Sequence, residues 1–355
     1  MPPALPADYL RGPQGQVLPV APSDAIALPP GLSGDWSLFV SGMVPSSIEL
    51  PGSGQVIAHP LSVAGSPIPQ QQSVIQGVVS PPQAGIVVQY TSRGRHVFVG
   101  TTTQADGSFA FTVPIVGPES GLLVARDRAT TPRLGLANVT LTPNATEDVQ
   151  PVALVSPGPA ATSLPLLPSG WHNSASLLEV AMSDAQGPWR ATVLAVNSPS
   201  LPTYPLPSYL LVNDYFAASG DNMAGGETSG IPGQVPDFLP APQLAGLPSS
   251  IAAGSPLNWP PVPSASLYTL QLTPQQQLTT PVWEGATVKP SLTVPQDLVP
   301  GASTLDLELD AWDAPGVDIY SVASLPSLPR ALIVPEGPPG TSGRHSWNRM
   351  AIAWQ

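Results

Sequence analysis

Carboxylates at alternating positions form the densest group of potentially chemical residues in this sequence. Asp306, Glu308 and Asp310 alternate with leucines over residues 305–311. Calcium takes about six to eight oxygen ligands, but carboxylates two apart on a strand lie about 7 Å from each other, so one ion would need a loop folded over them. These three residues are a weak calcium candidate, and the pattern favours a solvated strand face.

A second weak calcium candidate lies in a glycine-rich stretch. Asp221, Asn222 and Glu227 fall within residues 220–233. Their spacing lacks the regular alternation of oxygen-bearing residues in an EF-hand loop. A flexible turn explains the stretch equally well, and we predict no metal site from either candidate.

The histidines are dispersed. His59, His96, His172 and His345 include no pair at the spacing of one strand face or one helix face. A zinc or copper site would need them to converge from distant segments, so exposed or locally bonded imidazoles are expected. The absence of cysteine excludes disulfides, thiolate metal sites and cysteine nucleophiles.

Sequence motifs of catalysis and of nucleotide binding are also missing. No Gly-x-Ser-x-Gly elbow occurs, and no glycine-rich phosphate loop follows a strand and opens a helix. We therefore predict no catalytic residue, no cofactor and no enzymatic activity. A hydrolase whose residues meet only in space is the least favoured alternative.

Tryptophans are the residues most compatible with ligand binding, because flat rings stack on sugars or apolar partners. The ligand itself stays unknown, and most of these rings are expected in the core. The six without a predicted core role are Trp171, Trp189, Trp283, Trp312, Trp347 and Trp354.

The charge balance excludes one class of partner. The formal net charge is −12, and Lys and Arg together number 11. A phosphate-binding surface needs clustered basic residues, so nucleic acid is not an expected partner. No run of 18 or more apolar residues occurs, so no transmembrane segment is predicted.

Composition favours short strands joined by turns. The 355 residues include 49 Pro and 32 Gly, while hydrophobic residues make 42% and charged residues 10%. Proline breaks helix interiors, and the high apolar content opposes disorder. The chain is long enough for two or three modules of roughly 100 residues. We predict an all-β fold of tandem Greek-key or immunoglobulin-like sandwiches.

Residues 73–155 carry the clearest strand pattern, with about seven short apolar runs separated by turn residues. Ile75–Val79, Gly85–Val88 and Thr103–Pro114 resemble the carboxypeptidase regulatory-like (transthyretin-like) domain family. Asp106-Gly107 suits a tight turn, after which Phe109, Phe111 and Val113 would alternate into the core. The resemblance implies a non-catalytic accessory or adhesion module of an exported protein.

Residues 241–340 more weakly resemble a fibronectin type III-like domain. Trp259 would be the core indole, with Tyr268, Leu270 and Leu272 on the inward face. In the run 305–311, Leu305, Leu307 and Leu309 would face inward and the intervening acids outward.

The remaining segments are assigned by pattern. Residues 177–182 and 189–196 predict a strand pair in a loop-rich β region, with long loops at 199–207 and 220–236. Strands are also predicted at 34–40 and 55–58. The predicted organisation is a Pro-rich segment at 1–30, a β-strand segment at 31–72, a sandwich at 73–155, a loop-rich β region at 156–240, a sandwich at 241–340 and a C-terminal strand at 341–355.

These patterns favour a structural or adhesion protein of the cell envelope or extracellular space. A carbohydrate- or peptide-binding accessory protein is the alternative, and other envelope proteins or surface glycans are the expected partners. The start at Met1 lacks the basic and apolar regions of a signal peptide. Either an export signal has been removed, or the protein is cytoplasmic.

Overall fold

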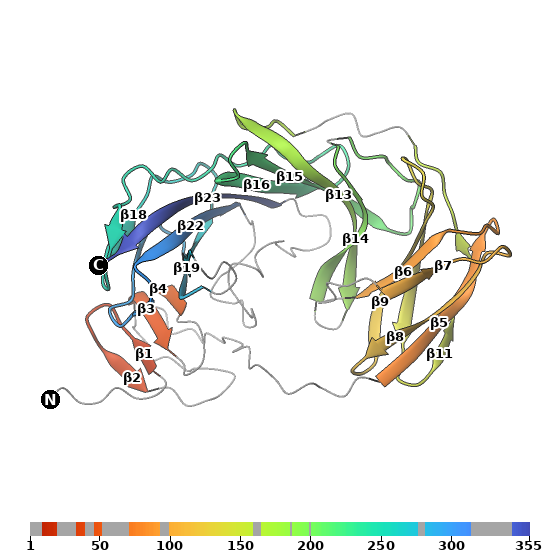
Figure 1. The fold of residues 1–355 in the computed structure, drawn as a ribbon, viewed down its shortest axis with the longest axis horizontal. Coiled ribbons are helices and arrows are strands. Elements are labelled where there is room, and N and C mark those ends of the chain that lie inside the picture. Colours follow the sequence, from red (N-terminus) through yellow and green to blue (C-terminus); the bar gives the residue numbers. More distant parts are fainter. Residues whose placement is uncertain are drawn as a thin grey trace.

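The computed structural model describes residues 9–19, 33–39, 46–51, 71–92, 99–158, 165–184, 187–198, 200–275, 281–313 and 343–355. Within these ranges every helix or strand is a β-strand, so the all-β prediction is confirmed (Figure 1). The strand predicted at 55–58 lies outside the described residues. No helix in the same ranges has the length and apolar character needed to cross a membrane.

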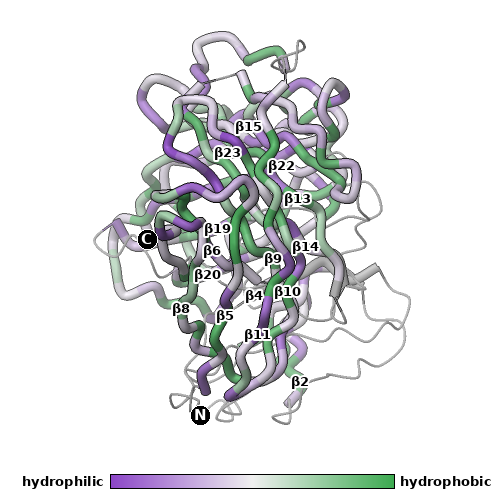
Figure 2. Tube along the Cα trace, turned by 90° about the vertical axis from the view of Figure 1, so that its right-hand side faces the viewer, coloured by the Kyte–Doolittle hydropathy of each residue, from purple (hydrophilic) through white to green (hydrophobic). Residues whose placement is uncertain are grey.

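One 13-stranded sheet joins segments from the beginning, middle and end of the chain. Its order is β14 (Gly187–Val196), β13 (Trp171–Asp184), β15 (Leu210–Ser219), β16 (Ala224–Gly230), β23 (Gly343–Trp354), β22 (Thr304–Asp313), β19 (Leu267–Pro274), β20 (Trp283–Thr287), β4 (Ser46–Pro51), β3 (Ser33–Phe39), β1 (Tyr9–Arg11) and β2 (Val17–Pro19). Neighbours along this path are antiparallel except β20 and β4, and β17 (Ser250–Ile251) pairs in parallel with β23. Figure 2 shows hydrophobic and hydrophilic segments interleaved along these strands.

A separate pair of four-stranded sheets forms between residues 71 and 153. One contains β11 (Thr146–Asp148), β5 (Gln71–Ser80), β12 (Val152–Ala153) and β8 (Ser108–Ile115); the other runs β10 (Leu134–Leu141), β9 (Glu119–Arg126), β6 (Val87–Ser92) and β7 (Val99–Thr102). Phe109 and Val113 are buried between them, and Phe111 packs against the same core from a partly buried position. These are the positions at which the sequence predicted inward-facing side chains.

The turn before β8 forms where the sequence predicted it. Gly107 has a φ of 77°, a left-handed conformation that favours glycine, and its N–H donates to the carbonyl of Gln104 at 3.0 Å. The Asp106 carboxylate accepts hydrogen bonds from the Ser108 amide and hydroxyl. The turn therefore sets the register in which Phe109 enters the core.

Strand β9 is buried on both faces. Leu123 and Ala125 belong to the core between the two four-stranded sheets, whereas Leu122 and Val124 pack against β13 and β14 of the large sheet. The sheet that contains β9 is therefore a middle layer, and Figure 1 shows it between β14 and β5. Tyr204 strengthens this junction by donating a 2.7 Å hydrogen bond to the carbonyl of Pro132.

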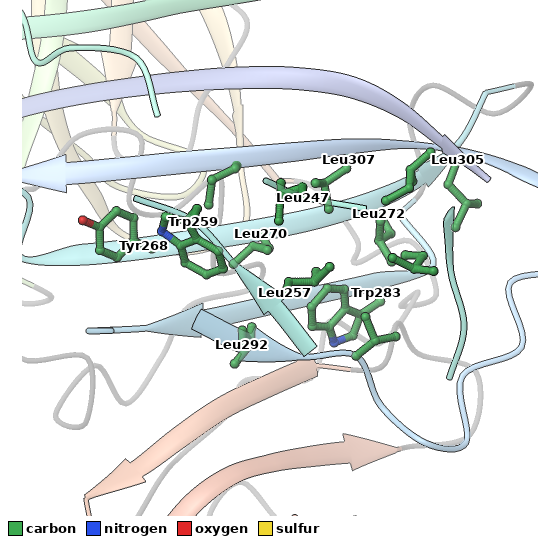
Figure 3. Packing of buried hydrophobic residues seen from close by; sticks show 14 of the residues in the cluster. Leu247, Leu257, Trp259, Tyr268, Leu270, Leu272, Trp283, Leu292, Leu305 and Leu307 are labelled. Atoms are coloured by element: carbon green, nitrogen blue, oxygen red, sulfur yellow. The ribbon is translucent and has the colours of Figure 1, made fainter. Parts of the chain in front are cut away.

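A third core lies over β19, β22 and β23. It is covered by a two-stranded ribbon of β18 (Pro256–Asn258) and β21 (Ser291–Thr293), which contributes Leu257 and Leu292 (Figure 3). Trp259 is buried in this core, as predicted, and its ring meets that of Tyr268 edge-on at 5.5 Å. The other side chains predicted to face inward are Leu270, Leu272, Leu305, Leu307 and Leu309, and all five are buried here.

The loop-rich interpretation of residues 156–240 is partly wrong. The predicted strand pair is present as β13 and β14, but the predicted loop at 220–236 contains β16, and β15 precedes it. Three of the seven β16 residues are glycines, which carry no strand preference and hide the element from pattern analysis.

Adjacent leucines on β9 test the middle-layer arrangement. Leu122→Ala and Leu123→Ala should each lower the free energy of unfolding by about 2–5 kcal/mol in urea denaturation, because each leaves a cavity in a different core. Val299→Ala, at a position with 86% exposure, is the control and should change little. A large cost at only one leucine would mean that one face of β9 is not buried.

Candidate functional site

A row of polar side chains crosses the middle of the large sheet on one face. We call this row the polar ridge. Its members lie on consecutive strands of the sheet, from β14 through β13, β15, β16, β23 and β22 to β19. They alternate with core residues along these strands, so they share the face opposite the apolar cores. They are Arg190, Thr192, Glu179, Asp214, Glu227, His345, Trp312, Asp310 and Thr269.

His345 and Asp310 form one end of the polar ridge. The His345 Nε2 atom lies 2.8 Å from Oδ1 of Asp310, which is 2% exposed. The second oxygen of Asp310 accepts a 3.0 Å hydrogen bond from the Thr269 hydroxyl. The indole N–H of Trp312 in turn donates to the Thr269 oxygen at 3.0 Å. Both carboxylate oxygens of Asp310 are therefore held within the sheet.

Aromatic rings fix the His345 imidazole. Trp312, directly opposite on β22, stacks on it with ring centroids 3.7 Å apart and planes 10° apart. Trp347, two residues along β23, lies at 5.5 Å. A stacked ring bonded to a buried carboxylate has little rotational freedom, so this arrangement orients the imidazole rigidly.

Asp214 and Glu227 form a carboxyl pair at the centre of the polar ridge. Asp214 on β15 pairs with Ser229 of β16, which makes Glu227 its diagonal neighbour on the same face. Burial, and then the neighbouring charges of Glu227 and Glu179, raise the pKa of Asp214 well above its usual range. Burial also raises the pKa of Glu227 to about 7, against the opposing effect of His345.

Glu179 and Arg190 form the other end of the polar ridge. Oε1 of Glu179 accepts a 3.0 Å hydrogen bond from the Thr192 hydroxyl. Its Oε2 lies 3.7 Å from the Arg190 guanidinium, which is also largely buried. Burial raises the pKa of Glu179, and Arg190 opposes that rise.

Glycines in β16 make room for the rings on either side of the sheet. A Cβ on Gly225 would lie 2.2 Å from the Trp347 ring, and one on Gly226 would lie 3.0 Å from the Trp171 ring. Both glycines are thus packing requirements. The glycines that weaken β16 as an isolated strand allow it to lie between two indoles, one on each side of the sheet.

The opposite face of these strands carries a proline-rich segment. Thr228, Ser346 and Asn348 donate side-chain hydrogen bonds of 2.7–2.9 Å to the carbonyls of Pro236, Pro240 and Pro242 respectively. Prolines keep their carbonyl acceptors although they lack N–H donors. The segment is therefore fastened to β16 and β23 on the side away from the polar ridge.

Asp306 and Glu308 of the acidic ladder on β22 are partly exposed, but Asp310 does not lie on the solvated face that the sequence predicted. Asp310 is buried because β22 lies between β19 and β23, and its partners are His345 and Thr269. Glu308 instead pairs with Arg349, and Asp306 accepts a 3.0 Å hydrogen bond from Gln275. The three carboxylates bond separate partners and do not converge on one point.

The second calcium candidate is also divided. Asp221 lies in the turn between β15 and β16, where its carboxylate accepts hydrogen bonds from Ser219 and the Met223 amide. Asn222 follows with a φ of 56°, whereas Glu227 is buried in the polar ridge. In the ranges given above, no group of three or more His, Cys, Asp or Glu is placed to hold a metal ion.

The other predicted candidates separate into buried and exposed residues. His172 is exposed on β13, and His59 and His96 lie outside the described residues. Trp189, Trp283 and Trp312 are buried, whereas Trp171, Trp347 and Trp354 are partly exposed. Trp347 lies on the polar-ridge face of β23, and Trp354 packs against the core on the other face. The latter two rings therefore do not form one binding platform.

Three charged residues of the polar ridge, Glu179, Arg190 and Asp214, were not identified from the sequence. The available signal was a charged residue within an otherwise apolar strand, since such residues are rarely buried unless paired. Chemically, the polar ridge can hold protons and orient an imidazole. The bonds of His345 and Asp310 given above are all to groups of the sheet itself.

Comparisons with known proteins identify no family for this chain. No family model matches it, and no curated protein matches it. The carboxypeptidase regulatory-like resemblance therefore stays a prediction.

Solved structures show only weak similarity. A DUF3823 family protein from Parabacteroides merdae is 11% identical, with coverage of 46% of this chain and 92% of that one, at a TM-score of 0.18. The FN1–FN3 domains of chicken CNTN1 are 8% identical, with 64% and 84% covered, at 0.17. A Ca2+-stabilized, ice-binding adhesin of an Antarctic bacterium is 12% identical, with 88% of each chain covered, at 0.16. TM-scores this low carry no argument about this chain.

The glycine beneath Trp347 provides a matched test. Gly225→Ala should lower the free energy of unfolding by about 1–3 kcal/mol, because the added methyl group would collide with the indole. Gly220→Ala is the control, since a Cβ there would meet nothing within 4 Å. Chemical denaturation followed by tryptophan fluorescence measures both. Equal stability of the two variants would contradict the packing role of Gly225.

Proposed function

We propose that this chain is a non-enzymatic structural or adhesion protein of the cell envelope or extracellular space, built from β-sandwich modules. Residues 73–155 are the proposed carboxypeptidase regulatory-like module, and residues 241–340 the proposed fibronectin-like module. The observation that carries the proposal is the continuity of the 13-stranded sheet, which joins strands from distant parts of the sequence into one body.

The position of β23 supports a load-bearing role. It pairs along its length with β22, from Thr304 opposite Ala353 to Asp313 opposite Arg344, and its first half also pairs with β16. Withdrawing it would break hydrogen bonds on two sides. A strand held in this way resists extension more than an edge strand does.

The middle layer supports the same role. Because β9 packs into two cores, the four-stranded sheets cannot move away from the large sheet without exposing Leu122 and Val124 to water. Burial of such side chains stabilises the junction by about 1.5–3 kcal/mol each. The sandwich and the large sheet are thereby coupled mechanically.

The alternatives receive less support. Glycan binding by stacking would use exposed rings, but Trp189, Trp283 and Trp312 are buried. The hydrolase alternative has one favourable feature, which is that Glu227 lies opposite His345 in the strand register while Asp310 bonds the same imidazole. This histidine is held under Trp312, an arrangement that suits a structural role.

Single-molecule force measurements test the load-bearing role. Cysteines placed by Leu166→Cys and Gln355→Cys give unique attachment points, because the chain has no native cysteine. We expect a single dominant rupture when β23 is withdrawn. Met350→Gly should lower the rupture force, since glycine weakens a strand interior, whereas Val299→Gly in an exposed segment should not. Smooth extension without a rupture peak would count against the proposal.

Antibody labelling of intact cells of the source organism tests the proposed location. We expect label at the surface without permeabilisation, or antigen in the medium. Label that appears only after the cells are permeabilised would contradict an envelope or extracellular location.

A further inference from the structure

Strands β1, β2, β3 and β4 lie together at one end of the large sheet (Figure 1). We call the described residues between 9 and 51 the N-terminal arm. The rings of Tyr9 and Phe39 stack with centroids 4.8 Å apart. Trp36 is 2% exposed and packs against Gly12, where an added Cβ would lie 2.8 Å from the indole. The N-terminal arm therefore has aromatic packing of its own.

A short junction joins the N-terminal arm to the rest of the sheet. Strand β4 pairs with β20 at three positions and in parallel, whereas it pairs with β3 at six positions and antiparallel. Parallel pairing is slightly less stable per residue than antiparallel pairing. Within the described ranges, the three apolar cores contain no residue of the arm. The junction is therefore not an extension of one of these cores.

Polar groups make further contacts at the junction. The buried Trp283 indole N–H donates a 2.9 Å hydrogen bond to the Ser47 hydroxyl, which lies 2.7 Å from the hydroxyl of Ser37. The Asp35 carboxylate accepts a 3.1 Å hydrogen bond from the amide of Thr293. Hydrogen bonds depend on distance and direction, so these contacts specify one docking position for the arm.

An ion pair adds a charged contact. One guanidinium nitrogen of Arg11 lies 2.8 Å from Oδ2 of Asp297, and these side chains are 21% and 22% exposed. The Tyr9 hydroxyl donates a 3.3 Å hydrogen bond to the same oxygen. Because water reaches this pair, water and salt compete with it. A junction with so many polar contacts can open without exposing any of the three apolar cores.

Opening the junction would leave β20 with an unpaired edge. Its five residues, Trp283–Thr287, include neither proline nor lysine, which commonly discourage pairing at a sheet edge. The groups that receive the arm, Trp283, Thr293 and Asp297, are the same in every copy of the chain. A vacant β20 therefore fits the arm of another copy as well as its own.

The order of the chain permits this choice. Ser47 and Trp283 are 236 positions apart. The strand that follows the arm, β5, begins at residue 71 and belongs to a different sheet. Residues 52–70 can reach roughly 60 Å when extended. The arm is thus held at β20 by its contacts and not by a short connection.

We propose that the N-terminal arm exchanges between copies, so that β4 of one chain pairs with β20 of a second copy and makes the same contacts there. Such exchange costs little free energy, because each contact that is lost within one chain is regained between two. The inference concerns association between copies and does not depend on the proposed location or load-bearing role.

Energy transfer between separately labelled full-length chains tests the exchange. A donor dye at Gln14→Cys marks the arm in one population, and an acceptor dye at Val299→Cys marks the docking site in another. Both positions are exposed, and the chain has no native cysteine. Because Arg11 contacts Asp297 in the docked arrangement, an exchanged arm brings donor and acceptor close together.

We expect energy transfer to appear after the two populations are mixed and to increase with protein concentration. An excess of unlabelled chain should suppress it. Absence of transfer at every concentration up to millimolar, or transfer that unlabelled chain does not suppress, would overturn the proposal.

Matched indole substitutions identify the junction. Trp283→Phe keeps a buried ring but removes the N–H that bonds Ser47, so exchange should become roughly 2- to 10-fold faster. Trp312→Phe removes an indole N–H that bonds Thr269 outside the junction, and it should leave the exchange rate unchanged. Equal rates in these two variants would mean that transfer arises from another contact and would overturn the proposal.

A second pair of variants serves if Trp283→Phe does not fold. Arg11→Gln removes the partly exposed ion pair of the junction, and exchange should become roughly 2- to 5-fold faster. Arg133→Gln removes a similar ion pair, with Asp127, outside the junction and is the control. An unchanged rate in Arg11→Gln, or an equal increase in the control, would contradict exchange through this junction.

Discussion

The pairing of β23 with both β22 and β16 is the constraint on which the rest of the structure depends. It places His345 beside Asp310 on one side and opposite Glu227 on the other. On the opposite face the same strand brings Ile352 into the core around Trp259. One strand thereby connects a buried polar row with an apolar core, and neither would be complete without it.

Sequence patterns predicted the elements that depend on neighbouring residues alone, such as strand alternation and tight turns. The alternation of Leu305, Leu307 and Leu309 identified a strand and its inward face because side chains alternate across a sheet. Asp106-Gly107 identified a turn because glycine adopts positive φ without strain. The core role of Trp259 was implied by the resemblance of its segment to fibronectin type III-like domains. The all-β fold was accessible for the same reason, since frequent prolines limit the length of every helix.

The features that the sequence did not reveal depend on pairing between strands that are distant in the chain. Asp310 has the same local pattern as Asp306, yet it is buried, because Thr269 and His345 approach it from strands distant in sequence. The β16 strand escaped detection because its glycines serve the rings above and below it. The meeting of Asp214 with Glu227 depends on the register of β15 and β16, and register is set by the whole sheet. The candidate site was therefore almost invisible from sequence, whereas the fold class was not.

The late position of β23 in the sequence has a consequence for synthesis on the ribosome. Ser229 and Gly343, which β16 and β23 bring within 3.5 Å, are 114 positions apart. Until β23 emerges, the nascent chain presents two unpaired edges, one on β16 and one on β22, and such edges invite pairing with other chains. Glycines in β16 and the acids of β22 make both edges poor templates for aggregation. The same residues that obscure this part of the fold in the sequence thus protect the partly assembled sheet until β23 joins it.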